Sequence, residues 1–210
     1  MNMQRNQSSS EIFDSTIPMH LGFPFTIGFD LHDGKSHERT TTKRYLSQMK
    51  NMYLDQQSFD KQLQTDDPLV YEFYELDLPS QSSDLKFGTT IIYPGRVGQE
   101  FYMTKGHFHQ ILDTAEVYYT LSGTGLMLME TPEGETKAKS LKPGQALYVP
   151  PRWAHRSINT DETPLVLFFV FRSDAGHDYG TIEKKGFRQL VLACEPDEPI
   201  IVPNPRWIDT

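Results

Sequence analysis

The sequence of 210 residues contains one cysteine, Cys194, and no long uninterrupted run of apolar residues. A single cysteine cannot form an intrachain disulfide, and this sparing use of sulfur fits a reducing compartment. No run approaches the roughly 18 apolar residues that a membrane-spanning helix needs. The polar N-terminus also lacks the apolar centre of a signal peptide. These absences predict a cytoplasmic protein that does not enter a membrane.

Basic residues are also in short supply. The chain has 20 Lys and Arg against 28 Asp and Glu, which gives a formal net charge of -8 at pH 7. A nucleic-acid-binding protein would carry a basic stripe to neutralise phosphates, and this sequence has none. We therefore expect no nucleic acid among its partners. The length is sufficient for one domain with a buried core and an appended N-terminal segment.

The N-terminal part differs in composition from the rest. Residues 1–16 are polar and rich in Ser and Gln, so ordering them would cost backbone entropy with little burial in return. We expect them to form a disordered tail. In residues 17–66, apolar side chains such as Leu46, Met49 and Tyr53 recur near helical spacing. This pattern predicts one or two helices that pack on the main domain.

The main domain, residues 67–210, consists of short β-branched and aromatic runs separated by turn residues. Expected strands lie at residues 69–76, 89–93, 100–104, 116–121, 126–131, 146–149, 165–171 and 187–194. Gly and Pro occupy the intervals, with hairpin turn chemistry at residues 122–125 and 132–135. Many short strands without helical intervals indicate an all-β barrel of jelly-roll type rather than an α/β fold. A C-terminal extension is expected to lie over its surface.

The main chemical signal is a pair of histidines, His107 and His109. On an extended strand, residues two apart point to the same face, so the two imidazoles would act together. Glu116 opens the next expected strand and can return a carboxylate beside the pair. His155 follows two further strand-and-turn units, the interval at which a barrel would bring it opposite the first pair.

Three imidazoles and one carboxylate suit a divalent transition metal such as iron, manganese, nickel, copper or zinc. The absence of thiolates argues against a closed structural zinc site. A His-x-His pair alone is weak evidence, because two histidines on a solvated strand face give the same pattern. Together with Glu116 and the Pro-Pro-x-x-x-His element that ends at His155, we interpret the pair as part of one metal site.

These elements are similar to the two metal motifs of the cupin superfamily, whose fold is a double-stranded β-helix. The six residues between His109 and Glu116 exceed the spacing usual there. The longer gap occurs together with YPGRVG at 93–98, MTKGHFH at 103–109, TPEGE at 131–135, PPRWAHR at 150–156 and DAGHDYG at 174–180. In this combination the sequence resembles the cupin-type phosphoglucose isomerases, from about residue 43 to Trp207 and most densely from 67 to 187.

The resemblance implies a homodimeric cytoplasmic enzyme of glycolysis and gluconeogenesis that interconverts glucose 6-phosphate and fructose 6-phosphate. It implies one divalent metal per chain, Fe(II) first and Mn(II) or Zn(II) next. The implied metal ligands are His107, His109, Glu116 and His155. The implied phosphate and sugar contacts are Tyr71, Thr90, Thr104, Gly106, Tyr118, His177 and Tyr179. One position departs from the family pattern, because Phe171 replaces a tyrosine and its phenol.

Aldose–ketose isomerisation moves a hydrogen between adjacent carbons, and a divalent metal with an open position can polarise the carbonyl. In a cis-enediol route, a general base takes and returns the proton. Glu116 is the first candidate for that base. If the metal commits its carboxylate, His177 and Tyr179 must handle the protons. In a hydride shift Glu116 is only a ligand, and the sequence leaves both routes open.

The contact residues also have purely structural interpretations. Strand threonines serve β-propensity, and Gly106 can simply allow a bend beside the metal site. Tyr71 and Tyr118 can be barrel packing with a hydrogen-bonded hydroxyl. His177 alone would be an ordinary solvated loop histidine. In the functional interpretation, Lys105 adds charge to the hydroxyls and backbone N–H groups that hold a phosphate.

Two other functions are compatible with this ligand set. An Fe(II)-dependent cupin dioxygenase uses the same three histidines and one glutamate, although the long His109-to-Glu116 gap and the loop containing His177 weigh against it. Oxygen consumption with a diketone substrate would support that alternative. A non-catalytic phosphosugar-binding cupin is the other, and tight binding without turnover would support it.

Overall fold

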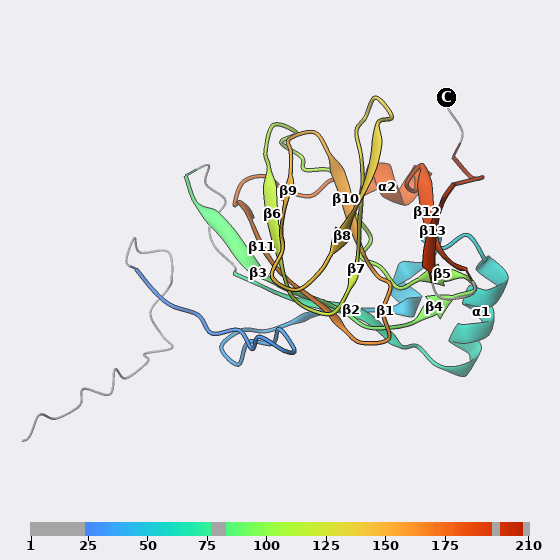
Figure 1. Ribbon diagram of the computed structural model, residues 1–210, viewed down its shortest axis with the longest axis horizontal. Coiled ribbons are helices and arrows are strands. Elements are labelled where there is room, and N and C mark those ends of the chain that lie inside the picture. The colour runs from blue at the N-terminus through green and yellow to red at the C-terminus, as the bar shows by residue number, and fades with distance from the viewer. Residues whose placement is uncertain (1–23, 77–82, 195–197, 208–210) are drawn as a thin grey trace, which may run out of the picture.

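The computed structural model describes residues 24–76, 83–194 and 198–207 (Figure 1). The tail expected at residues 1–16 lies outside the described residues. The strands are β1 (Thr42–Tyr45), β2 (Leu69–Glu75), β3 (Leu85–Ile92), β4 (Arg96–Val97), β5 (Glu100–Phe101), β6 (Glu116–Ser122), β7 (Gly125–Glu130), β8 (Thr136–Leu141), β9 (Ala146–Val149), β10 (Ala154–Asn159), β11 (Leu165–Arg172), β12 (Gln189–Cys194) and β13 (Glu198–Pro203). The helical elements are the 3-10 turn η1 (Leu46–Met49) and the helices α1 (Gln56–Thr65) and α2 (Gly180–Lys185).

The strands form antiparallel sheets in an order that differs from the chain order. The largest sheet runs β1-β2-β3-β11-β6-β9, a second runs β10-β7-β8, and a third runs β13-β12-β5-β4. Figure 1 shows β6 and β9 of the first sheet and β7, β8 and β10 of the second in the middle of the view, while α1 and the third sheet lie at the C-terminal side. Because β11 pairs with β3 on one side and with β6 on the other, strands distant in sequence are neighbours in the largest sheet. The predicted all-β cupin jelly roll is confirmed.

Strand β11 carries the middle of the barrel core. Leu165, Leu167, Phe169 and Phe171 alternate along it and are all buried, as expected for side chains that share one face of a strand. The ring of Phe169 lies 6.3 Å from that of Tyr118 on the neighbouring strand β6. This face of β11 thus leads from the apolar core at Leu165 to a cavity that Phe169 and Phe171 line.

The N-terminal segment is only partly helical. Helix α1 begins where the Asp55 carboxylate accepts the Ser58 N–H at 2.9 Å, which satisfies a free donor of the first turn. The expectation of helix within residues 17–66 is wrong at β1, because residues 42–45 pair antiparallel with β2 instead. The apolar side chains of the expected stripe, including Met49 and Tyr53, are buried.

Two further elements differ from the sequence expectation. Residues 104–109 are not a continuous strand, because only isolated bridges pair His107 with His155 and Phe108 with Asp178. Helix α2 interrupts the expected succession of strands after the loop that contains His177. Within the described part of the chain, no helix has the length and hydrophobicity needed to span a membrane.

Replacing Leu167 by Ala should lower the free energy of unfolding by about 2–5 kcal/mol, because Leu167 is fully buried and truncation leaves a cavity. Leu85→Ala on the adjacent strand is the matched control. Leu85 is 57% exposed, so the same truncation should change stability by less than about 0.5 kcal/mol. Urea unfolding of both variants measures the difference, and equal losses would contradict the assigned core.

Candidate metal centre and active site

A cavity of about 180 Å³ opens inside the barrel. Every residue that the sequence analysis proposed for the site lines this cavity, except His109, which lines a neighbouring cavity. The proposed residues on the cavity wall are Tyr71, Thr90, Thr104, Gly106, His107, Glu116, Tyr118, His155, His177 and Tyr179. They come from four strands, the segment before β6 and the loop before α2, so the fold brings together residues more than a hundred positions apart.

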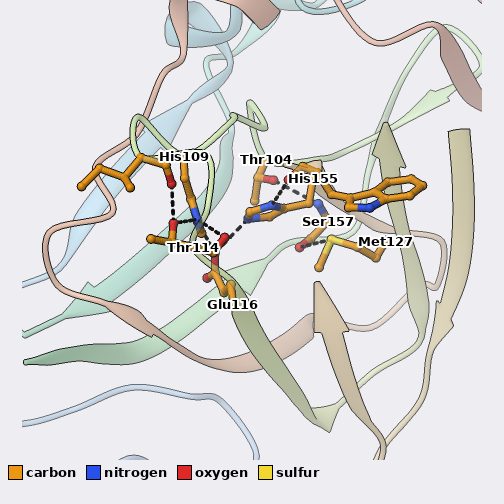
Figure 2. Close-up of polar contacts among 9 residues, drawn as sticks. Thr104, His109, Thr114, Glu116, Met127, His155 and Ser157 are labelled. Atoms are coloured by element: carbon orange, nitrogen blue, oxygen red, sulfur yellow. Dashed lines mark hydrogen bonds and ion pairs between the residues drawn. The ribbon is translucent and has the colours of Figure 1, made fainter. Parts of the chain in front are cut away.

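The four candidate ligands converge on one point. His107 and His109 come from the segment that precedes β6, Glu116 is the first residue of β6, and His155 lies on β10. The backbones of His107 and His155 exchange two hydrogen bonds, of 3.3 and 3.1 Å. One ligand atom from each of the four residues lies within 4.8 Å of the others. Figure 2 shows His109 and His155 directed at Glu116 from opposite sides.

Hydrogen bonds behind two of the imidazoles fix their tautomers. Thr114 donates its hydroxyl hydrogen to the Ile111 carbonyl at 2.7 Å, so its oxygen accepts from His109 Nδ1 at 2.7 Å. The carbonyl of Trp153 lies 3.3 Å from His155 Nδ1. Both Nδ1 atoms therefore carry hydrogen, and in the neutral rings the lone pair is on Nε2.

The direction of these Nε2 lone pairs shows whether the site fits a metal. The Nε2 atoms of His109 and His155 lie 3.1 and 2.9 Å from the same Glu116 oxygen. Lone pairs that face a carboxylate repel it, and a divalent cation between them turns the repulsion into coordination. His107 Nε2 is buried and has no hydrogen-bond partner among the described residues. The residues fit a metal of the kind that nitrogen and oxygen ligands select.

The protonation states of Glu116 and His107 also fit a metal site. Burial alone would raise the pKa of Glu116, but the electrostatic effect of the neighbouring imidazoles, chiefly His155, outweighs it and holds that pKa well below its usual range. Burial and the nearby His155 and His177 lower the pKa of His107 well below its usual value. An ionised carboxylate beside a neutral imidazole is the protonation state that a metal ligand set requires.

His177 and Tyr179 line the cavity beside the ligand His107. The His177 ring is 4.3 Å from the His107 ring, in a T-shaped contact. Burial lowers the pKa of His177 to about 4, so its ring is neutral at pH 7. Burial raises the pKa of Tyr179 to about 12, which keeps the phenol protonated. The ring of Phe171 lies 5.3 Å from His177, so the substituted position is part of the cavity wall.

Some residues on the cavity wall carry no sequence signal of their own. Phe73, Glu75, Ser157 and Phe169 also line it. Each is an inward-facing strand residue, and a sequence pattern cannot separate a strand residue on a cavity from one in the core. Thr114, in the connection before β6, likewise carries no sequence signal of its own. Its contact with His109 follows from the turn geometry.

A jelly-roll barrel in which three histidines and one glutamate converge beside a cavity is a cupin with a candidate metal centre. The model of the family described as glucose-6-phosphate isomerase matches residues 43–198. The chain belongs to the glucose-6-phosphate isomerase family.

Similar curated proteins carry the same description. "Glucose-6-phosphate isomerase" of Thermococcus litoralis is 44% identical over 88% of this chain and 96% of its own length. The protein of the same name from Pyrococcus furiosus is 45% identical over 88% of this chain and 97% of its own. A solved oxalate decarboxylase structure from Bacillus subtilis covers 50% of this chain and 26% of its own, with 24% identity and a TM-score of 0.40.

Replacing Thr114 by Val should weaken metal affinity by roughly 10–100-fold, because the hydrogen bond that orients His109 is lost. Thr120→Val is the matched control. Thr120 is buried on the same strand as Glu116, and its hydroxyl has no hydrogen-bond partner among the described residues. Competition with a metal-responsive dye measures affinity. Equal affinities in the two variants would show that Thr114 does not orient a ligand.

Proposed function

We propose that this protein interconverts glucose 6-phosphate and fructose 6-phosphate. The observation that carries the proposal is the group of His107, His109, Glu116 and His155, which lies at a cavity that Thr90, Thr104 and Gly106 also line. Membership of the glucose-6-phosphate isomerase family supports the same reaction.

The cofactor in this proposal is one divalent transition metal per chain, with Fe(II) first and Mn(II) or Zn(II) as the alternatives. His107, His109, Glu116 and His155 would hold it, and a set of nitrogen and oxygen ligands without thiolates suits these ions. When bound, such an ion supplies Lewis-acid polarisation of the sugar carbonyl.

The phosphate end of the substrate is assigned to Thr90, Thr104 and the Gly106 N–H group. The hydroxyl oxygen of Thr104 accepts the Ser157 N–H at 3.1 Å, which leaves the Thr104 hydroxyl hydrogen available as a donor. Lys105 forms an ion pair with Glu183 on α2 at 2.9 Å, so its charge is shared with that helix. Hydroxyl and peptide donors together suit a phosphate.

The sugar end is assigned to Tyr71, Tyr118, His177 and Tyr179. Burial raises the pKa of Tyr118 well above its usual value, and the adjacent Glu116 raises it further. Its phenol therefore stays protonated and can donate to a sugar hydroxyl. Phe171 offers no such hydrogen bond, so this wall of the cavity is apolar where the family has a phenol.

We assign the proton-handling role to His177 rather than to Glu116. Two imidazole nitrogens contact one oxygen of Glu116, and a carboxylate whose pKa is held low is a weak general base. The pKa of His177 is also lowered, to about 4, but it is lowered less far than that of Glu116. Neutral His177 is therefore the better proton acceptor of the two, while Tyr179 can donate a proton. Glu116 then acts chiefly as a ligand. A hydride shift, in which no base contacts carbon, is the competing route.

A homodimer and a cytoplasmic location complete the proposal. The single cysteine fits a reducing compartment, and phosphosugars are metabolites of such compartments. The dimer follows from the family resemblance and is tested by sedimentation.

The proposal predicts that chelator-stripped protein converts no fructose 6-phosphate and that addition of a single divalent metal restores turnover. A coupled assay that detects glucose 6-phosphate measures both. Calorimetric titration of the same samples with metal provides the control for loading. A metal-loaded, folded protein that turns over neither phosphosugar would overturn the assignment and leave a binding role.

Replacing His177 by Gln should lower kcat by at least about 100-fold and leave the metal content unchanged, because general acid–base catalysis contributes about 10²–10⁴. His32→Gln, at an exposed position outside the cavity, is the matched control. Exchange of solvent deuterium into the product should fall in parallel with turnover. Full activity in the His177 variant, or product without solvent deuterium, would favour the hydride shift.

A further inference from the structure

Residues 104–107 form several hydrogen bonds with β10. Thr104 donates its N–H to the Ser157 carbonyl at 2.9 Å, and His107 donates its N–H to the His155 carbonyl at 3.3 Å. Between them, the carbonyl of Lys105 accepts no hydrogen bond from a backbone N–H of the described residues. The side chain of Arg156 takes that place, with Nε at 3.1 Å and a terminal nitrogen at 2.6 Å from the Lys105 oxygen.

Arg156 is unusual because it is a buried charge without an ion pair. Its side chain is among the largest that are fully buried, and no carboxylate lies within 4 Å of it in the described part of the chain. Burial of an arginine is costly unless its donors are satisfied. Two of its N–H groups bind one carbonyl, and the guanidinium stacks at 4.6 Å over the Phe187 ring. The guanidinium thus holds a single peptide group in place through two hydrogen bonds to its carbonyl.

That peptide group also contains the Gly106 N–H. In a trans peptide the C=O and the N–H point in opposite directions. Because the Lys105 oxygen is directed at Arg156, the Gly106 N–H is directed away from that oxygen, and Gly106 itself lines the cavity. No acceptor for this N–H is found among the described residues. A positive charge on the carbonyl side also polarises the peptide, which strengthens the N–H as a donor.

The conformation of Gly106 leaves this peptide little freedom. Its φ is +74°, and a Cβ placed on it would lie 2.6 Å from the Phe187 ring and 3.0 Å from Arg156 Cβ. Only glycine suits this backbone conformation and this close approach. Phe187 therefore supports both the guanidinium and the turn whose peptide the guanidinium holds.

We propose that Arg156 is a positioning residue for the phosphate of the substrate, which acts by fixing and polarising the Lys105–Gly106 peptide so that the Gly106 N–H binds the anion. The inference deepens the proposed function and rests on it. Arg156 does not itself line the cavity, so it contributes through the peptide and not by contact with substrate.

The test uses Arg156→Met and Arg156→Lys in the full-length, metal-loaded protein. Lysine keeps the charge and one donor, whereas methionine removes both. We expect Arg156→Met to raise the Kd for inorganic phosphate and the KM for fructose 6-phosphate by about tenfold, the effect of losing one hydrogen bond to a charged group. Arg156→Lys should recover part of the affinity. In both variants the metal content and kcat should change by less than about twofold.

Arg206→Met is the matched control, because exposed Arg206 also donates to a backbone carbonyl, that of Tyr53. It should leave phosphate affinity unchanged. Unchanged phosphate affinity in folded Arg156 variants would overturn the proposal, as would loss of metal and kcat with phosphate affinity retained, since that pattern marks a structural support of His155. If Arg156→Met does not fold, the phosphate affinity of Arg156→Lys tests the proposal in its place.

Phosphate calorimetry also separates this inference from the proposed function. Wild-type protein that binds phosphate through Arg156 but isomerises no phosphosugar would sustain the positioning role and refute the reaction. Wild-type protein that binds no phosphate would overturn the role of Arg156.

Discussion

The site depends on one electrostatic constraint. Two imidazoles with their Nδ1 hydrogens directed away from the centre present Nε2 lone pairs to the same oxygen of Glu116. Without a cation these groups repel, and yet the strands hold them together. The tautomers follow from Thr114 and from the Trp153 carbonyl. Contacts outside the ligand set, from a threonine and from a backbone carbonyl, therefore orient the imidazoles for metal binding.

The same pairing of residues 104–107 with β10 connects the two ends of the cavity. His107 exchanges backbone hydrogen bonds with His155 at the metal end. One residue before His107, the Gly106 peptide is held by Arg156, the residue that follows His155. A short stretch of paired backbone thus sets the separation between the carbonyl-polarising centre and the proposed phosphate donor. Precise spacing of this kind lowers the cost of orienting a substrate that must react at one end and be held at the other.

Periodicity and turn residues were sufficient to predict the barrel, because β6, β7, β9 and β11 have β-branched or aromatic runs bounded by Gly and Pro. They were insufficient for β8, where Lys alternates with small residues, and for β10, where buried polar residues replace the apolar pattern. Strand β1 lies in a segment expected to be helical. Its extended conformation depends on pairing with β2, which the local sequence pattern does not reveal. Spacing and resemblance suggested the ligand residues. The contacts of Thr114 and Arg156 depend on tertiary pairing, and no local pattern predicts them.

X-ray absorption at the metal edge of protein loaded with one equivalent of Fe(II), Mn(II) or Zn(II) tests the central claim most directly. The account predicts a first shell with three imidazole nitrogens and a carboxylate oxygen, at about 2.0–2.2 Å for zinc, and loss of one imidazole in a His155→Ala variant that still binds metal. A first shell of mostly water or carboxylate oxygens, unchanged by that substitution, would show that the metal binds elsewhere. It would contradict the account.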